Sequence, residues 1–202
     1  MKDTKFNIIL SSSGFINTNK RSEEIDNLFK EIAKDKKVLL ITNSTRLGSN
    51  VQARADVKEN FEKCGAKIVE SIMVDRDNVE TILDADVIYG MGGNVACLLE
   101  DLQRCNFKKY LTQFLKKGIY IGESAGSIVL AKNTKYYFDI QKGTKPKYDV
   151  VEDFDFEGLG LTDKNIFPHY NQLSDVIKQK IADYEGLDID VLNDGEFVVE
   201  YY

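Results

Sequence analysis

A serine flanked by glycines is the sharpest chemical signal in the sequence. Residues 119–127 run from an apolar stretch through G-x-S-x-G into a helical pattern. A strand that turns tightly into a helix exposes such a serine at the carboxyl edge of a sheet, and it needs small residues such as Gly122 and Gly126 beside it, because larger side chains would collide with the neighbouring strand and helix. We therefore predict that Ser124 is a nucleophile and that the Ala125 N–H donates to an oxyanion at the helix start. A structural turn rich in glycine and serine is the alternative interpretation.

A serine nucleophile needs a base, and the chain contains one histidine. His169 follows Pro168 at the end of an apolar segment that is typical of a strand. We predict that it is the base, the alternative being a surface or structural histidine. A single imidazole excludes any site that needs two or more, such as a His-rich zinc centre.

A second glycine turn, in residues 87–94, follows another apolar run. It lacks the third glycine of the dinucleotide fingerprint and the Gly-Lys-Ser/Thr of a phosphate loop, so a nucleotide site is disfavoured. We expect Gly92 or Gly93 to supply an oxyanion-hole amide. We also expect substrate contacts from Asn94, in this turn, and from Glu123, beside the nucleophile.

Short apolar runs alternate with amphipathic stretches over the first 130 residues. We expect strands at 6–10, 37–42, 66–74, 86–90 and 119–122, and helices at 23–34, 51–64, 79–83, 94–105, 108–117 and from 124. This alternation predicts an α/β fold with a mostly parallel central sheet and helices on both faces.

The composition of the chain changes after about residue 131. Residues 136–140 and 197–202 are rich in aromatic and β-branched side chains, and we expect strands there within an irregular excursion. Residues 141–147 are polar and turn-prone, 149–156 are acidic, and 173–184 are expected to form a helix.

Composition limits the remaining possibilities. The 202 residues suffice for one sizeable core, so we expect a single domain over residues 1–202. A net charge of −6 gives no general attraction to nucleic acid or anionic lipid. Three cysteines without C-x-x-C spacing suggest neither a disulfide framework nor a Cys-only zinc site. No signal sequence or membrane span is visible, so a cytoplasmic location is expected.

The serine turn, the upstream G-x-G-G-N turn and the downstream P-H-Y together resemble the peptidase E (aspartyl dipeptidase) and cyanophycinase group of serine peptidases. The resemblance runs from about Phe6 to Gly195. It implies a three-layer fold related to class I glutamine amidotransferases, with no metal or organic cofactor. It also implies a small peptide as substrate, and we expect a monomer or homodimer.

The residues by themselves leave the acid of a catalytic triad open. The candidates include Asp139, Asp149, Asp153, Asp175, Asp190 and Glu196. The resemblance implies an acid in an L-P-[DE]-G-like turn, which residues 192–195 match, and so it points to Asp194. An ordinary Asp-Gly hairpin turn between strands around Val191 and Phe197 is also compatible with this segment.

The resemblance implies hydrolysis of small peptides, with N-terminal Asp as one preference. That preference calls for a cation, yet residues 171–178, just after the histidine, contain no arginine. A lysine could serve, as a point charge without the two-pronged geometry of arginine. A relative that keeps the fold but binds a small molecule or protein partner is the alternative function. A glutamine amidotransferase would need cysteine where this chain has Ser124.

Overall fold

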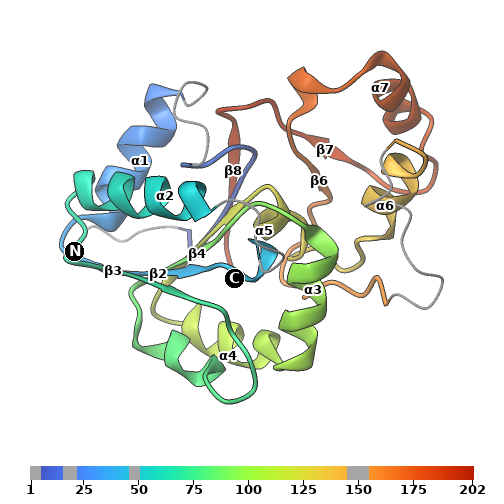
Figure 1. Cartoon of the computed structure of the whole chain (residues 1–202). Helices are drawn as coiled ribbons and strands as arrows, with labels where there is room; N and C mark the ends of the chain where they lie inside the picture. The colour runs from blue at the N-terminus through green and yellow to red at the C-terminus, as the bar shows by residue number, and fades with distance from the viewer. Residues whose placement is uncertain (1–5, 16–21, 46–50, 145–154) are drawn as a thin grey trace.

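The computed structural model describes residues 6–15, 22–45, 51–144 and 155–202. Its main feature is a six-stranded sheet with the strand order β3-β2-β4-β5-β1-β8 (Figure 1). The strands are β1 (Ile8–Ser11), β2 (Lys37–Ile41), β3 (Ile68–Ile72), β4 (Val87–Gly90), β5 (Ile119–Glu123) and β8 (Phe197–Glu200). The first five are parallel and β8 runs antiparallel to β1, which confirms the expected mostly parallel sheet.

Alternating side chains of the central strands build a separate core on each face of the sheet. In β1, Ile8 and Leu10 belong to one core and Ile9 to the other. Helices α1 (Glu23–Ala33) and α2 (Val51–Lys63) cover the face of Ile9, whereas α3 (Val95–Arg104), α4 (Phe107–Phe114) and the short α5 (Ala125–Ile128) cover the opposite face. Figure 1 shows the resulting three layers, with the sheet between α1 and α2 on one side and α3 and α4 on the other.

Capping residues explain where two of these helices begin. The Ser22 hydroxyl accepts the Ile25 N–H at 3.2 Å, and the Asn94 side chain accepts the Cys97 N–H at 3.1 Å. Each cap satisfies one of the amide donors that a helix start leaves without a partner. Both helices therefore start within one residue of their expected positions.

The expected strand at residues 136–140 is wrong, because this segment is part of helix α6 (Lys135–Gln141). Tyr136, Phe138 and Ile140 are all buried there, and the Tyr136 hydroxyl donates to the Ile166 carbonyl at 2.8 Å. Aromatic residues favour strands only weakly, and burial in a packed core overrides that preference. The pattern of apolar residues in this segment therefore indicated its hydrophobicity correctly, but it did not predict its secondary structure.

The C-terminal part forms a second, two-stranded parallel sheet of β6 (Ile166–Phe167) and β7 (Asp190–Val191), which helix α7 (Asp175–Ala182) separates along the chain. The turn at Asp194 and Gly195 therefore does not close a hairpin, since β7 and β8 belong to different sheets. Gly195 has φ +85°, as the third position of a type II turn requires. The turn carries the chain from one sheet to the other.

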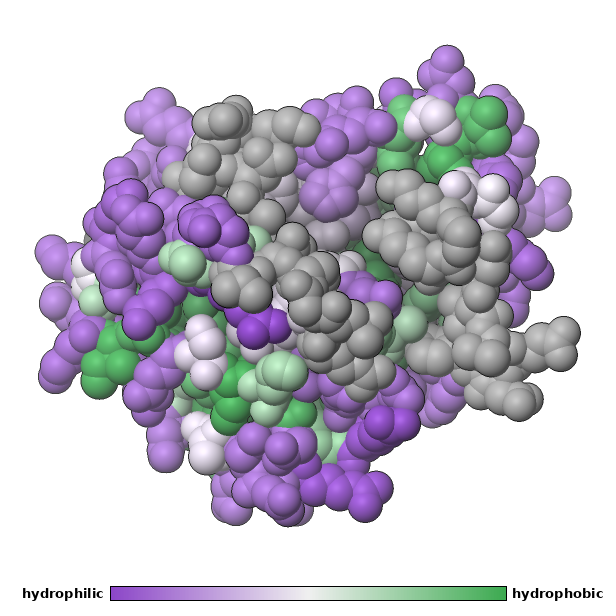
Figure 2. Space-filling view, viewed as in Figure 1, coloured by the Kyte–Doolittle hydropathy of each residue, from purple (hydrophilic) through white to green (hydrophobic). Residues whose placement is uncertain are grey.

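Most of the coloured surface in Figure 2 is hydrophilic, and the hydrophobic side chains form separate patches, one of them over α7. Val176 of α7 is 66% exposed. None of the described helices combines the length and hydrophobicity needed to cross a membrane. Most of the acidic segment 149–156, including Asp149 and Asp153, lies outside the described residues.

Candidate active site

Four turns meet at one edge of the main sheet, because the parallel strands β1, β2, β4 and β5 all end there. They carry Ser12 and Ser13 after β1, whose last residue is Ser11, residues 43–45 after β2, residues 91–94 after β4 and Ser124 after β5. Carboxyl edges of parallel sheets are the usual place for binding and catalytic groups. The predicted nucleophile and the predicted oxyanion turn are thus brought to the same edge.

Ser124 occupies a strained turn between β5 and α5. Its φ of +47° and ψ of −106° are rarely adopted by a residue with a side chain, at a cost of about 1–3 kcal/mol. The surrounding backbone holds this conformation: the Ser124 N–H donates to the Ser11 carbonyl at 2.9 Å, and the Ser124 carbonyl accepts the Ser127 N–H at 2.9 Å. This geometry matches the strand-to-helix elbow expected from the sequence.

The glycines on either side of Ser124 are required by close backbone approach. A Cβ on Gly122 would lie 2.7 Å from backbone atoms of Gly126, and a Cβ on Gly126 would lie 2.1 Å from the carbonyl oxygen of Gly90 in β4. Neither position can hold a larger residue without moving backbone. The G-x-S-x-G spacing therefore reflects packing of the elbow against the neighbouring strand.

His169 reaches the elbow from the second sheet. It follows β6 and has φ +60° and ψ +30°, in the left-handed region. Its Nε2 lies 3.1 Å from Ser124 Oγ, within hydrogen-bonding distance. The imidazole is 37% exposed, so one side of it remains open to solvent and to an incoming ligand.

Asp194 contacts the other ring nitrogen of His169, so that Ser124, His169 and Asp194 form one series of contacts. Its Oδ1 lies 2.7 Å from His169 Nδ1, and its side chain is 1% exposed. Its other oxygen, Oδ2, accepts a hydrogen bond from the Gln172 side chain, and the Asp194 N–H donates to Asn171 Oδ1 at 3.0 Å. A carboxylate can only accept, so Nδ1 carries the proton in this contact and Nε2 is left to accept one from Ser124.

The other described acid candidates have different partners. Asp139 pairs with Lys135 and accepts the Tyr184 O–H at 3.1 Å, and Asp190 pairs with Lys164 at 3.0 Å. Glu196 accepts the Asn193 N–H at 2.7 Å, and Asp175 begins helix α7. Only Asp194, among the described acids, contacts His169.

The glycine turn after β4 packs directly against the elbow. A Cβ on Gly92 would lie 3.3 Å from the Ser124 Cβ. The Gly92 N–H points to Glu123 Oε2 at 3.4 Å, whereas, among the described residues, the N–H groups of Gly93 and Ala125 have no hydrogen-bond acceptor. Gly93 is exposed and Gly92 is buried. The two amides that remain available thus belong to Gly93 and Ala125.

The two residues expected to contact substrate have structural partners. Asn94 caps α3, and its N–H donates to the Ser44 carbonyl at 2.9 Å. Glu123 is 1% exposed and lies behind the glycine turn. A direct contact of either side chain with substrate stays a prediction.

Sequence reasoning missed several residues that hold the site. Gln172 contacts Asp194, the Ser12 hydroxyl accepts the His169 N–H at 2.8 Å, and the Ser13 hydroxyl accepts the Gly195 N–H at 3.0 Å. Three consecutive serines after a buried strand were the available signal, because buried hydroxyls need partners. Nothing in the local sequence marks Gln172.

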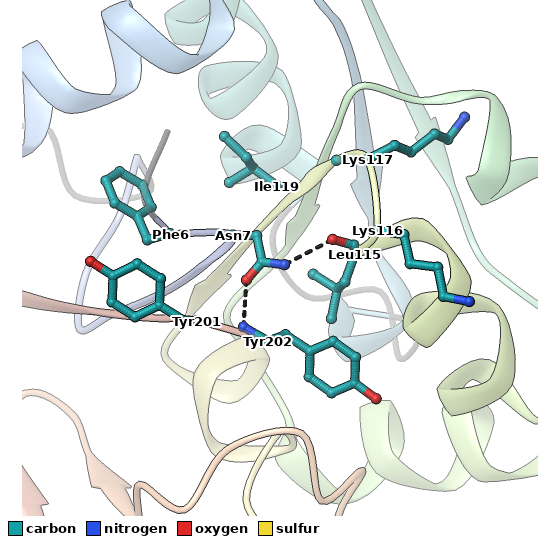
Figure 3. A pocket seen from close by; sticks show the side chains of 9 residues that line it. Phe6, Asn7, Leu115, Lys116, Lys117, Ile119, Tyr201 and Tyr202 are labelled. Atoms are coloured by element: carbon teal, nitrogen blue, oxygen red, sulfur yellow. Dashed lines mark hydrogen bonds between the residues drawn. The ribbon is translucent and has the colours of Figure 1, made fainter. Parts of the chain in front are cut away.

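Figure 3 shows a pocket of about 300 Å³ that is separate from this site. Asn7 bridges it by donating to the Leu115 carbonyl at 2.8 Å and accepting the Tyr202 N–H at 2.8 Å. Asn7 precedes β1, so the pocket lies at the amino edge of the sheet, opposite Ser124. Within the described ranges, no three His, Cys, Asp or Glu side chains are grouped so that they could hold a metal ion.

An α/β protein that places a serine on a strained elbow, with an imidazole and a buried carboxylate in series, has the architecture of a serine hydrolase. The sequence profile of peptidase family S51 matches residues 8–200. The chain therefore belongs to peptidase family S51, a family of serine-type peptidases. The resemblance seen in the sequence motifs is confirmed.

Curated relatives agree with this assignment. The chain is 32% identical over 133 residues to the uncharacterized peptidase Lin0382 of Listeria innocua, a match that covers 63% of this chain and 62% of that protein. It is 32% identical over 95 residues to peptidase E of Streptomyces coelicolor, covering 46% of this chain and 36% of the relative. The matches thus span less than two thirds of these relatives' own lengths.

Solved structures show the same fold. A candidate peptidase E protein from Listeria monocytogenes EGD-e superposes with a TM-score of 0.76 at 25% identity, over 96% of this chain and 94% of that one. A peptidase from an acI-B1 actinobacterium superposes with a TM-score of 0.69 at 17% identity, over 97% and 83% of the two chains. The three-layer fold expected from the sequence is confirmed.

Proposed function

We propose that this S51 peptidase hydrolyses small peptides with Ser124 as nucleophile, His169 as general base and Asp194 as the acid that orients the imidazole. The observation that carries the proposal is the unbroken series of contacts from Ser124 Oγ to His169 Nε2, at 3.1 Å, and from His169 Nδ1 to Asp194 Oδ1, at 2.7 Å. In this series the hydroxyl can lose its proton to Nε2 as it attacks.

Each step follows from that geometry. Ser124 Oγ bonds to the scissile carbonyl carbon while His169 Nε2 takes its proton. The C–N bond then breaks as the imidazolium returns this proton to the leaving amine, which leaves an acyl-enzyme. A water molecule, deprotonated by the same imidazole, hydrolyses the ester and restores Ser124.

The amides of Gly93 and Ala125 are the proposed donors to the tetrahedral oxyanion. Their availability supports this role, and so does the close packing of the glycine turn on Ser124. Each such donor contributes about 2.7–4 kcal/mol of transition-state stabilisation in other hydrolases. Gly92, whose N–H points to Glu123, would hold the turn instead of contacting the oxyanion.

Arg54 is the proposed cation for an acidic substrate side chain such as an N-terminal Asp. Its Nη2 donates to the Thr45 carbonyl at 3.0 Å and its Nε donates to the Thr45 hydroxyl at 2.7 Å, and among the described residues it has no carboxylate partner. The adjacent Ser44 donates from its hydroxyl to the Gly92 carbonyl at 2.9 Å, so this arginine is anchored beside the proposed oxyanion turn. Thr45 binds the Nε and Nη2 edge of the guanidinium, so the Nη1 side is the one proposed to bind a substrate carboxylate.

A fluorophosphonate probe tests the catalytic part. We expect stoichiometric labelling at Ser124, no labelling of Ser124→Ala, and a large loss of labelling in His169→Ala. Absence of labelling in well-folded wild-type protein would contradict the proposal and favour the alternative of a non-catalytic binding protein.

Cleavage of a dipeptide library by the wild type and by Arg54→Met tests the substrate class. We expect Arg54→Met to raise KM at least tenfold for Asp-X dipeptides and to leave Ala-X cleavage within about threefold, which corresponds to the loss of a charge-assisted pair. Equal effects on both substrates would show that Arg54 supports the fold and does not select substrate.

A further inference from the structure

We propose that the three consecutive serines at the end of β1, Ser11, Ser12 and Ser13, position the three members of the proposed triad. We call residues 11–13 the serine segment. This inference rests on the proposed function, because it assigns the segment a role in holding Ser124, His169 and Asp194. The segment is a positioning element: none of its hydroxyls contacts a reacting atom.

Ser11 holds the elbow. Its carbonyl accepts the Ser124 N–H and the Ser127 hydroxyl, both at 2.9 Å, and its own hydroxyl donates to the Gly122 carbonyl at 2.7 Å. Three bonds from one residue therefore fix the strained turn on both sides of Ser124. Strained backbone persists only where the surroundings determine it in this way.

Ser12 holds the segment that carries the base. Its hydroxyl accepts the His169 N–H at 2.8 Å, and its own N–H donates to the Glu196 carbonyl at 3.1 Å. His169 stands in the left-handed region just after β6, outside the main sheet. The hydroxyl of Ser12 thus fixes the backbone from which the imidazole reaches Ser124.

Ser13 holds the segment that carries the acid. Its hydroxyl accepts the Gly195 N–H at 3.0 Å, directly after Asp194, and the Ser22 hydroxyl donates to the Gly195 carbonyl at 2.8 Å. The peptide groups that follow Asp194 are therefore bound on both their donor and acceptor sides. The segments of His169 and Asp194 are also joined to each other, through the Tyr170 N–H and the Leu192 carbonyl at 3.0 Å.

Burial explains why the hydroxyls of these serines must be hydrogen-bonded. The three serines are 0–2% exposed, and a buried hydroxyl destabilises the fold unless it is hydrogen-bonded. Here Ser11, Ser12 and Ser13 form hydrogen bonds to the segments that carry Ser124, His169 and Asp194, and these segments follow strands of two different sheets. A displacement of about 1 Å between reacting groups can cost about a hundredfold in rate, so these bonds bear directly on catalysis.

The variants Ser12→Ala and Ser13→Ala test the inference, with Thr162→Val as matched control. Thr162 is also buried, and its hydroxyl also accepts a backbone N–H, that of Lys164, at 3.0 Å. It donates to Glu200, which pairs with Ile8 at the opposite end of β1 from the site. All three variants therefore remove one buried hydroxyl that serves a backbone amide.

Two readouts separate positioning from general stability. The first is the rate of fluorophosphonate labelling at Ser124. The second is the low-field proton resonance of His169 Nδ1–H, which is unambiguous because the chain has one histidine. We expect the serine variants to label ten- to a hundredfold more slowly and to shift or broaden this resonance, while Thr162→Val changes neither.

Unfolding midpoints are measured in parallel, and Ser12→Cys covers the case in which an alanine variant fails to fold. Cysteine is close to serine in shape but a weak acceptor, so an intermediate loss of labelling is expected. Wild-type labelling and resonance in both serine variants, or an equal loss in Thr162→Val, would overturn the inference. If the wild type does not label but its resonance is lost in Ser12→Ala, the proposed function fails while the positioning role stands.

Discussion

The Nδ1 atom of His169 lies 2.7 Å from Oδ1 of Asp194, and the two side chains differ sharply in exposure, at 37% and 1%. The buried carboxylate faces a proton-bearing nitrogen, while the opposite nitrogen of the same ring faces Ser124. This arrangement fixes both the tautomer and the direction of the imidazole. The contact therefore decides whether His169 can accept a proton.

Replacing Asp194 by asparagine is expected to lower kcat by about three to four orders of magnitude, with little loss of stability. The amide would donate to Nδ1 and leave the proton on Nε2, which then cannot accept one from Ser124. Steady-state kinetics on a cleaved dipeptide measure the effect. Asp139→Asn is the control, because Asp139 pairs with Lys135 away from the imidazole; near-normal activity of Asp194→Asn would contradict the assignment.

Gly126→Ala is expected to abolish labelling of Ser124 and to lower the free energy of unfolding by about 1–3 kcal/mol or more, because the new Cβ would lie 2.1 Å from the Gly90 carbonyl oxygen. Denaturant unfolding and probe labelling measure the two effects. Gly186→Ala provides the comparison. Gly186 has φ +81° and no neighbour within 4 Å of a Cβ, so only a backbone cost of about 1–2 kcal/mol and no loss of labelling are expected.

Glu123→Ala is expected to lower kcat about tenfold while KM changes less than twofold, since the Gly92 N–H would lose its acceptor and the oxyanion turn would shift. Glu123→Gln retains an acceptor oxygen and should recover most of the activity. Kinetics on Asp-X and Ala-X dipeptides measure both variants. A selective gain on Asp-X peptides would show instead that Glu123 faces the substrate, as the sequence suggested.

Cys105 is expected to resist alkylation in the native protein, because burial raises the pKa of its thiol from 9.0 to about 11. At pH 8 about one molecule in a thousand would carry the reactive thiolate. Iodoacetamide labelling with peptide mass spectrometry should show Cys105 modified at pH 8 only after denaturation. Rapid native modification at that pH would contradict the burial.

The same pKa has a consequence for stability. The folded state favours the protonated thiol, so this contribution is complete below the unfolded pKa of about 9 and is lost as pH rises towards about 11. Denaturant midpoints measured across that interval should fall in the wild type. The fall should be smaller in Cys105→Ala, which lacks the titrating group.

The amino-acid sequence by itself determined the main sheet, most helices and two of the three proposed triad residues. These features depend on neighbours in the chain: apolar runs form buried strands, caps begin helices, and the elbow requires glycines at fixed spacing around Ser124. A single histidine left one candidate for the base. Asp194 came from the family resemblance, since composition and spacing left several acids open.

Only the tertiary structure decided which groups meet. Residues 136–140 became helical because they pack into a core, and the Asp194 turn joined two sheets instead of closing a hairpin. The bonds from Ser12 to His169 and from Ser13 to Gly195 span 157 and 182 residues. Contacts between residues so far apart leave no local pattern in the sequence. The partners meet only when the chain folds, so the identity of one residue does not predict that it contacts the other.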